Sequence, residues 1–181
     1  MKSLETKLKG VLLIVPDVFG DNRGFFLESY SRKKYQEIGI ECEFVQDNHS
    51  ASTKGTLRGM HWQINPGQAK LVRTTSGEVF DVVVDIRKNS PTFGQWEGFY
   101  LSAENKKQLF VPFGFAHSFC VLSDIAEFQY KCSTYYSKND ERGFIWNDPT
   151  INIQWPIESP ILSQRDMKQP FFKDLNTKDL F

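Results

Sequence analysis

The stretch from Leu71 to Arg87, LVRTTSGEVFDVVVDIR, is the sequence feature that most narrows the fold. It contains two β-rich runs separated by Ser76-Gly77, a dipeptide typical of a turn. In the second run the residues alternate with a period of two, which indicates a β-strand. The two faces of that strand are Phe80, Val82, Val84 and Ile86 on one side and Val79, Asp81, Val83 and Asp85 on the other. The segment therefore predicts a strand with one apolar face and a second face that carries two carboxylates.

Short runs of the same kind occur along the rest of the chain, and turn-forming residues separate them. The turn signals are Pro16-Asp17, Gly20-Asp21, Asn65-Pro66-Gly67, Ser90-Pro91 and Pro112-Phe113-Gly114. The further strands that we expect are Val11–Val15, Gly24–Tyr30, Glu43–Gln46, Gly98–Leu101, Gln108–Val111, His117–Leu122 and Glu127–Cys132.

One segment near the start predicts a helix, from Ser31 to Ile38, with Ser31 as its N-cap and Gly39 as its stop. Many short strands with few helices indicate a sandwich, jelly roll or barrel, whose interior cavity can open to a ligand. No repeat, low-complexity tract or linker divides the sequence. We therefore expect residues 1–181 to form a single domain, long enough to bury a substantial core.

Charge and cysteine usage exclude several classes of protein. The 22 basic and 22 acidic residues cancel, which argues against a nucleic-acid or membrane-surface partner. Cys42, Cys120 and Cys132 form no CxxC pair, so reduced thiols are expected rather than a zinc knuckle or a disulfide framework. The N-terminus MKSLETKLKG lacks the apolar core of a signal peptide, and no run approaches membrane-spanning length. These features predict a cytoplasmic protein.

The first candidate for chemistry is His61, one of three histidines in the chain. It lies in LRGMHWQ, shortly after Arg58, and Lys70 follows in QAKLVR. If both segments are inward-facing strands, a base, a phosphate-binding cation and an ammonium group meet in one pocket. A hydrogen-bonded core histidine is the competing interpretation of His61, and the pattern supports the two about equally.

The second histidine of interest is His117, in the stretch PFGFAH, which resembles the Pro-x-Gly-x-x-His element of the cupin signature. In metal-binding cupins that histidine completes a site begun by a His-x-His pair. Here the equivalent place reads His61-Trp62-Gln63, without the second imidazole. The sequence therefore favours a cupin barrel without a metal. A three-histidine metal site that also uses His49 remains an open alternative.

Tyr130, in EFQYKCSTYY with Tyr135 and Tyr136, could supply a phenol acid and an aromatic platform, although packing in a strand is the commoner role of a tyrosine. Asp166 taken alone is an ordinary surface carboxylate. The chain has no phosphate-cradling glycine-rich loop and no GxSxG motif. Nicotinamide, ATP and acyl-enzyme chemistries therefore lose support.

Taken together, the motifs resemble the dTDP-4-dehydrorhamnose 3,5-epimerase family. The resemblance runs from about Leu8 to Asp166, and the tail after Asp166 is less characteristic. It implies a mostly β, cupin-type jelly-roll barrel with a few short peripheral helices. It also implies a nucleotide-sugar substrate, a homodimer with strand exchange, and no metal or organic cofactor. The matching stretches are DVFGDNRGFFLESY, FVQDNHSASTKGTLRGMHWQ, QAKLVRTTSGEVFDVVVDIRKNSPTFGQW, LSAENKKQLFVPFGFAHSF, YKCSTYY and WNDPTINIQWP.

The same resemblance implies roles for particular residues. His61 is the expected general base, oriented by Asp166, and Tyr130 is the expected proton donor on the opposite face of the sugar. Lys70 is expected to hold the C4 oxygen as it becomes an enolate. The residues expected to line the pocket for diphosphate and sugar are Arg58 and His117. Those expected to hold the nucleotide, some of them across the dimer, are Arg23, Phe26, Glu28, Gln46, Asn48 and Tyr136.

Three alternatives stay open at this point. The first is a relative that acts at one carbon only, or on another nucleotide sugar such as a GDP-linked 4-keto heptose. The second is a non-catalytic cupin that only binds a sugar nucleotide or an anion. The third is a metal-dependent cupin oxygenase or isomerase built on His49, His61 and His117.

Overall fold

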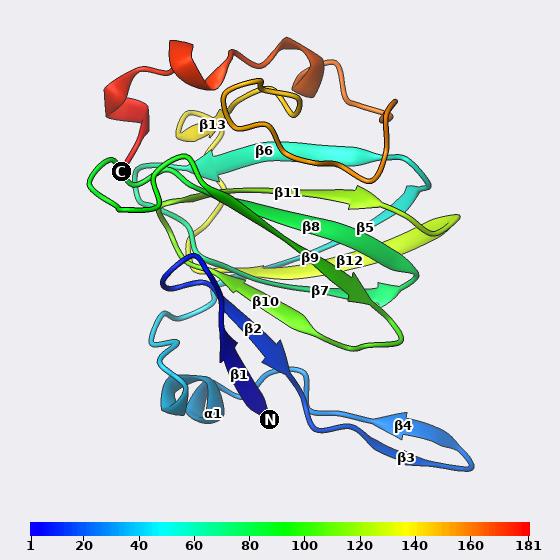
Figure 1. Ribbon diagram of the computed structural model, residues 1–181. Coiled ribbons are helices and arrows are strands. Elements are labelled where there is room, and N and C mark those ends of the chain that lie inside the picture. The colour runs from blue at the N-terminus through cyan, green and yellow to red at the C-terminus, as the bar shows by residue number, and fades with distance from the viewer.

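Two antiparallel β-sheets stacked face to face form the body of the protein, as the computed structural model of residues 1–181 shows (Figure 1). The six-stranded sheet has the order β1-β2-β10-β7-β12-β5, and the five-stranded sheet has the order β13-β6-β11-β8-β9. The first sheet consists of β1 (Lys2–Glu5), β2 (Leu12–Val15), β10 (Gln108–Val111), β7 (Lys70–Ser76), β12 (Ile125–Cys132) and β5 (Gln46–Thr53). The second consists of β13 (Glu141–Gly143), β6 (Leu57–Gln63), β11 (Phe115–Val121), β8 (Glu78–Asp85) and β9 (Trp96–Ser102). This arrangement confirms the expected cupin-type jelly roll.

The main core lies between the two sheets. Inward-facing apolar side chains of both sheets meet there, among them Val72 and Phe128 from the first sheet and Val83, Leu101 and Phe119 from the second. The rings of Phe119 and Phe128 stack at a centroid separation of 4.1 Å across this layer. Both sheets are therefore held together by the burial of apolar surface, the main favourable contribution to folding.

Each sheet also has a covered outer face. Helix α1 (Arg32–Glu37) packs on the six-stranded sheet, where Tyr35 and Ile40 join a buried cluster with strand residues. Residues 166–181, here called the C-terminal strap, run over the outer face of the five-stranded sheet and carry the 3-10 helices η1 (Asp166–Lys168), η2 (Phe172–Asp174) and η3 (Thr177–Asp179) (Figure 1). No helix has the length and apolar character needed to cross a bilayer.

The two-stranded hairpin of β3 (Phe19–Asp21) and β4 (Gly24–Phe26), here called the arm, projects away from the sandwich (Figure 1). Its phenylalanines Phe19, Phe25 and Phe26 are 65%, 62% and 68% exposed. A cluster of exposed apolar side chains on a projecting element is typical of a surface that another molecule covers.

Most of the expected strands are confirmed within one or two residues, but two are not. The strand expected at Gly24–Tyr30 ends at Phe26, because the chain then leaves the arm and Tyr30 packs into the cluster beneath α1. The strand expected at Glu43–Gln46 instead begins at Gln46 and continues to Thr53. Phe44 also belongs to the cluster beneath α1, so its apolar side chain serves packing outside the sheet.

The helix is close to its expected bounds, at Arg32–Glu37. Ser31 occupies the N-cap position but its side chain makes no capping hydrogen bond. Gly39 ends the segment with a left-handed φ of 88°. The stop signal and the N-cap position are therefore as expected, although the Ser31 hydroxyl does not cap the helix.

The Ser76-Gly77 turn carries the chain from one sheet to the other, since β7 and β8 belong to different sheets. Gly77 has a φ of 72°, and a Cβ at this position would lie 2.1 Å from the carbonyl oxygen of Ile125. Only glycine fits such a close approach of backbone to backbone. The carboxylate face of β8 is turned inward, and both Asp81 and Asp85 are fully buried.

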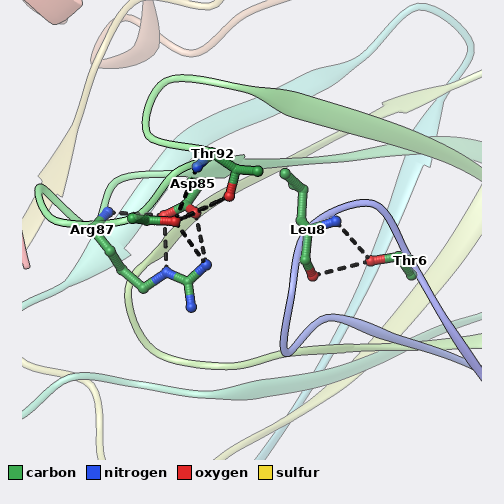
Figure 2. Close-up of polar contacts among 6 residues, drawn as sticks. Thr6, Leu8, Asp85, Arg87 and Thr92 are labelled. Carbon is green, nitrogen blue, oxygen red and sulfur yellow. Dashed lines mark hydrogen bonds and ion pairs between the residues drawn. The ribbon is translucent and has the colours of Figure 1, made fainter.

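The Asp85 carboxylate holds the loop that follows β8 in place through hydrogen bonds to side chains of that loop (Figure 2). Its carboxylate accepts hydrogen bonds from Arg87 Nε at 2.9 Å and Arg87 Nη2 at 2.6 Å, and from the Ser90 and Thr92 hydroxyls at 2.6 Å each. Burial acts to raise the pKa of Asp85, but the hydrogen bonds from Arg87, Ser90 and Thr92 outweigh it and lower that pKa to about 2. The ionised carboxylate is therefore part of the folded structure.

We expect Asp85→Asn to lower the free energy of unfolding at pH 7 by roughly 2 kcal/mol, the value of a pKa shift of that size. Because the folded pKa lies below the ordinary value, wild type has this stabilisation above about pH 4 and loses it as pH falls toward 2. Urea unfolding of both proteins between pH 7 and pH 2.5 checks this. An equal gap between the two proteins at every pH would contradict it.

Candidate active site

A cavity of about 420 Å³ opens between the two sheets at the end where β6, β11, β7 and β12 lie together. Its walls combine titratable side chains with a small aromatic floor. The lining residues include Arg58, His61, Lys70, His117, Phe119, Phe128, Tyr130, Ser163, Arg165 and Asp166. Seven of the 15 lining residues carry charged or titratable groups, so the cavity is suited to proton transfer on a polar ligand.

His61 and His117 occupy directly opposite positions on the neighbouring strands β6 and β11. The His61 ring bonds through Nε2 to Asp166 Oδ1 at 2.6 Å, and its Nδ1 has no hydrogen-bond partner in the chain. A carboxylate at Nε2 favours the tautomer that carries its proton there, which leaves Nδ1 as a free acceptor. The geometry thus presents His61 as a base.

Asp166 is held by more than the imidazole. It is 3% exposed, and its Oδ2 accepts a hydrogen bond from the Ser163 hydroxyl at 2.9 Å. Burial acts to raise the pKa of Asp166, but the hydrogen bonds from His61 and Ser163 outweigh it, so the pKa lies below its ordinary value. The interpretation of Asp166 as a surface carboxylate is therefore wrong, because the strap folds it back against β6.

His117 has a carboxylate partner of its own. Its Nε2 lies 2.9 Å from both oxygens of Asp81, which stands on the inward face of β8. Burial raises the pKa of Asp81, and the neighbouring His117 and Lys70 act in the opposite direction. His117 is thereby fixed in one orientation at the cavity wall, beside the ring of Phe128.

Lys70 and Tyr130 come from the facing sheet. Lys70 is the cross-strand partner of Cys132, two residues beyond Tyr130 on β12, so both side chains lie on the same face. The Lys70 ammonium forms no ion pair or hydrogen bond within the chain and lies 6.0 Å from the centre of the Tyr130 ring. Burial lowers the pKa of Lys70 and raises the pKa of Tyr130. Across the cavity from His61, the protein therefore places an amine and a phenol.

A chain of polar contacts extends from Arg165, which lines the cavity, to residues outside its lining. The Gln46 amide donates to Asn48 Oδ1 at 3.1 Å and accepts from the backbone of Tyr136 at 3.0 Å. The Tyr136 hydroxyl and Arg165 Nη1 both donate to the Glu141 carboxylate, at 2.7 Å and 2.6 Å. Arg58, another lining residue, donates to the Ser52 hydroxyl at 3.0 Å.

Not every expected residue meets in this cavity. Arg23, Phe26 and Glu28 belong to the arm and its continuation, where Arg23 pairs with Asp21 and Glu28 pairs with Lys34. None of the three lines the cavity of its own chain, and the same holds for the expected nucleotide-binding residues Gln46, Asn48 and Tyr136.

His49 is also elsewhere. It lies on the outward face of β5, half-exposed, with its Nε2 3.0 Å from Glu127. His49 therefore cannot complete a three-histidine metal site with His61 and His117. The chain contains no other group of three or more His, Cys, Asp or Glu side chains arranged to hold a metal ion.

Sequence reasoning missed four residues that shape the site. Asp81 was recognised as a carboxylate on β8, and the alternation of that strand could have assigned it to the inward face. Glu141 and Arg165 gave no such signal, because they contact each other across 24 residues of sequence. Ser163 lies only three residues before Asp166, so its local hydrogen bond to that carboxylate could have been considered.

Comparison of the chain with known proteins identifies its family. The family model described as dTDP-4-dehydrorhamnose 3,5-epimerase matches residues 5–174. The dTDP-4-dehydrorhamnose 3,5-epimerase of Shigella flexneri is 58% identical over 176 residues, which cover 96% of this chain and 97% of that protein.

Two solved structures have nearly the same fold. The dTDP-6-deoxy-D-glucose-3,5-epimerase of Legionella pneumophila, in complex with dTDP-4-keto-L-rhamnose, superposes with a TM-score of 0.96 at 47% identity, covering 99% of this chain and 96% of that one. The dTDP-4-dehydrorhamnose 3,5-epimerase of Bacillus anthracis, with TDP and PPi bound, gives a TM-score of 0.92 at 48% identity, covering 94% and 98%.

The fold and the cavity define a cupin-type sugar epimerase, an enzyme of the isomerase class. More closely, the chain belongs to the dTDP-4-dehydrorhamnose 3,5-epimerase family.

Proposed function

We propose that the cavity inverts C3 and C5 of dTDP-4-keto-6-deoxyglucose by removing a proton from one face of the sugar and returning one to the other. The observation that carries this proposal is the placement of His61 and Tyr130 on facing sheets of one cavity, with Lys70 beside Tyr130. Inversion needs a base and an acid on opposite sides of the same carbon, and this arrangement supplies both.

Proton removal is assigned to His61. Its Nδ1 is free to accept a proton, while Asp166 at Nε2 stabilises the imidazolium that results. A positioned general base typically contributes about 10²–10⁴ in rate. Asp166 is suited to this task because its carboxylate is ionised and already oriented by Ser163.

Stabilisation of the enolate is assigned to Lys70. A proton next to a ketone becomes acidic only as far as the negative charge on the carbonyl oxygen is stabilised. An ammonium group with no protein partner, held in a partly dehydrated cavity, is prepared for that oxygen before the reaction begins. One such fixed donor is typically worth about 10²–10³ in rate.

Proton return is assigned to Tyr130, whose raised pKa keeps the phenol protonated near neutral pH. The reaction consists only of proton transfers and a transient enolate, and side chains of the chain handle each of them. We therefore propose that no metal or organic cofactor takes part.

The identity of the nucleotide is inferred from the ligands of the related solved structures. The Legionella protein was solved with a dTDP sugar and the Bacillus protein with TDP, which favours dTDP over the GDP-linked alternative for this chain. Arg58 and His117 line the cavity where a diphosphate and sugar would lie. Gln46, Asn48 and Tyr136 lie outside its lining, and hydrogen bonds connect them through Glu141 to Arg165. The three free cysteines fit the reducing environment of the cytoplasm.

We expect His61→Ala to abolish the incorporation of solvent deuterium at C3 and C5 of dTDP-4-keto-6-deoxyglucose, a loss of about 10²–10⁴ in rate. Mass spectrometry of the sugar nucleotide after incubation in D₂O measures this exchange. His49→Ala, which removes the exposed histidine on the outer face, is the matched control and should exchange as wild type does. Retained exchange at both carbons in His61→Ala would remove His61 from the role of base.

For Tyr130→Phe we expect deuterium exchange to persist while inversion at C5 falls by about 10²-fold, because the base remains and the acid is gone. NMR of the product distinguishes the two outcomes, since exchange and inversion are read separately. Tyr135→Phe, at a tyrosine that is 71% exposed, serves as the control. Full epimerisation by Tyr130→Phe would assign proton return to another group.

We further propose that the arm completes the cavity of a second copy in a homodimer with exchanged strands. Arg23, Phe26 and Glu28 do not line the cavity of their own chain, yet they lie on or next to an element that projects from the body. The exposed arm phenylalanines would be buried by this exchange, which is a favourable use of apolar surface. The three residues would then hold the nucleotide in the partner's cavity.

Complementation between variants checks the arm. We expect Phe26→Ala and His61→Ala each to have low activity alone, and a mixture of the two to regain part of it after subunit exchange. A mixed dimer combines the intact cavity of the Phe26→Ala chain with the intact arm of the His61→Ala chain. A mixture no more active than its components, with exchange verified by native mass spectrometry, would show that the arm does not act across the dimer.

A further inference from the structure

Asp148, in the WNDPTINIQWP segment that follows β13, has no part in the reaction proposed above. It is 1% exposed and forms no ion pair. Its carboxylate accepts three backbone hydrogen bonds instead. Oδ1 accepts from the N–H groups of Thr150 at 2.8 Å and Ile151 at 3.1 Å, and Oδ2 accepts from the N–H of Phe172 at 2.7 Å. The first two close a local turn, whereas the third reaches the C-terminal strap.

The contact with Phe172 fixes the strap shortly after the residue that matters for catalysis. Phe172 lies six positions beyond Asp166 in the sequence. Between them, the carbonyl of Pro170 accepts a hydrogen bond from the N–H of Ile145 at 2.9 Å. The beginning of the strap is thus tied at two points to the segment that contains Asp148.

The chain just before that segment pairs with β6, the strand that carries His61. Gly143, at the end of β13, is the cross-strand partner of His61. A Cβ at Gly143 would lie 2.6 Å from the carbonyl oxygen of Met60 and 2.8 Å from the side chain of Gln169. The strap therefore packs directly against β13, with no room for a side chain between them.

These contacts close a ring. It passes from His61 to Gly143 across the sheet, along the chain to Asp148, through the hydrogen bond to Phe172, and back along the strap to Asp166, which meets His61 at 2.6 Å. Asp148 supplies the one side-chain link in this ring besides the catalytic pair itself.

We propose that Asp148 is a positioning residue for the reaction: it holds the start of the C-terminal strap so that Asp166 stays aligned with His61. The inference rests on the proposed function, in which Asp166 orients the base. A carboxylate that accepts backbone hydrogen bonds binds more strongly than a neutral acceptor, so the strap loses a firm support when it is removed. Displacement of a catalytic group by about 1 Å can lower a rate by about 10²-fold.

The test uses Asp148→Ser, whose hydroxyl can still cap the turn at Thr150 but is too short to reach Phe172. We expect kcat to fall by about tenfold with KM changed less than about twofold, because substrate contacts are untouched. Asp148→Asn, which keeps the size and loses the acceptor for the Phe172 N–H, is the second variant if the serine variant does not fold. Unchanged kcat in a folded variant would overturn the proposal.

Tyr35→Phe is the matched control for a general loss of stability. It removes buried hydrogen bonds of the Tyr35 hydroxyl to the Ser29 carbonyl at 3.1 Å and to Gln108 at 3.2 Å, beneath α1 on the other sheet. We expect its melting temperature to fall while its kcat stays at the wild-type value. An equal fall in kcat at a matched loss of melting temperature would assign the Asp148 effect to stability alone.

A double variant separates this inference from the proposed function. If Asp148 acts through Asp166, adding Asp148→Ser to Asp166→Asn should lower kcat no further. An additional tenfold loss in the double variant would show that Asp148 acts by another route. Full activity of Asp166→Asn alone would instead refute the role of Asp166, and with it the part of the proposed function on which this inference rests.

Discussion

The hydrogen bond between His61 and Asp166 joins residues 105 positions apart, and much of the architecture serves to bring them together. His61 is carried by the second strand from the edge of the five-stranded sheet, whereas Asp166 arrives only after the chain has completed both sheets. The strap then folds over the outer face of the same sheet and buries its aromatic residues there. Burial of that apolar surface thus fixes the first residue of the strap at the cavity, within hydrogen-bond distance of His61.

The sandwich itself determines which groups can act from opposite sides of a substrate. Strands β6 and β11 supply His61 and His117 from one sheet, and β7 and β12 supply Lys70 and Tyr130 from the other. Side chains on regular strands have little freedom to shift, because each is flanked by packed neighbours such as Phe119 and Phe128. A cavity between two sheets therefore holds a base and an acid at a fixed separation more rigidly than loops would.

The sequence allowed the jelly roll and most of its strands to be predicted, because strands such as β8, β10 and β12 need apolar residues at alternate positions for the core. It did not reveal β5, whose sequence QDNHSAST has no apolar face and forms a strand by pairing with β12. His61, Lys70 and Tyr130 were found from their motifs, and the structure brings them together. Asp166 was found by family resemblance alone, and Ser163 was missed although it lies only three residues before Asp166. Glu141 was missed because its contact with Arg165 follows from the fold and leaves no local pattern.

The solitary ammonium group of Lys70 has a consequence for the energetics of the empty enzyme. An ammonium group held away from bulk water with no direct hydrogen-bond or ion-pair partner loses hydration that the protein does not replace, and burial accordingly lowers the pKa of Lys70. A ligand oxygen that meets this group restores the missing interaction, so affinity for an electron-rich carbonyl is obtained at the expense of the stability of the unliganded protein.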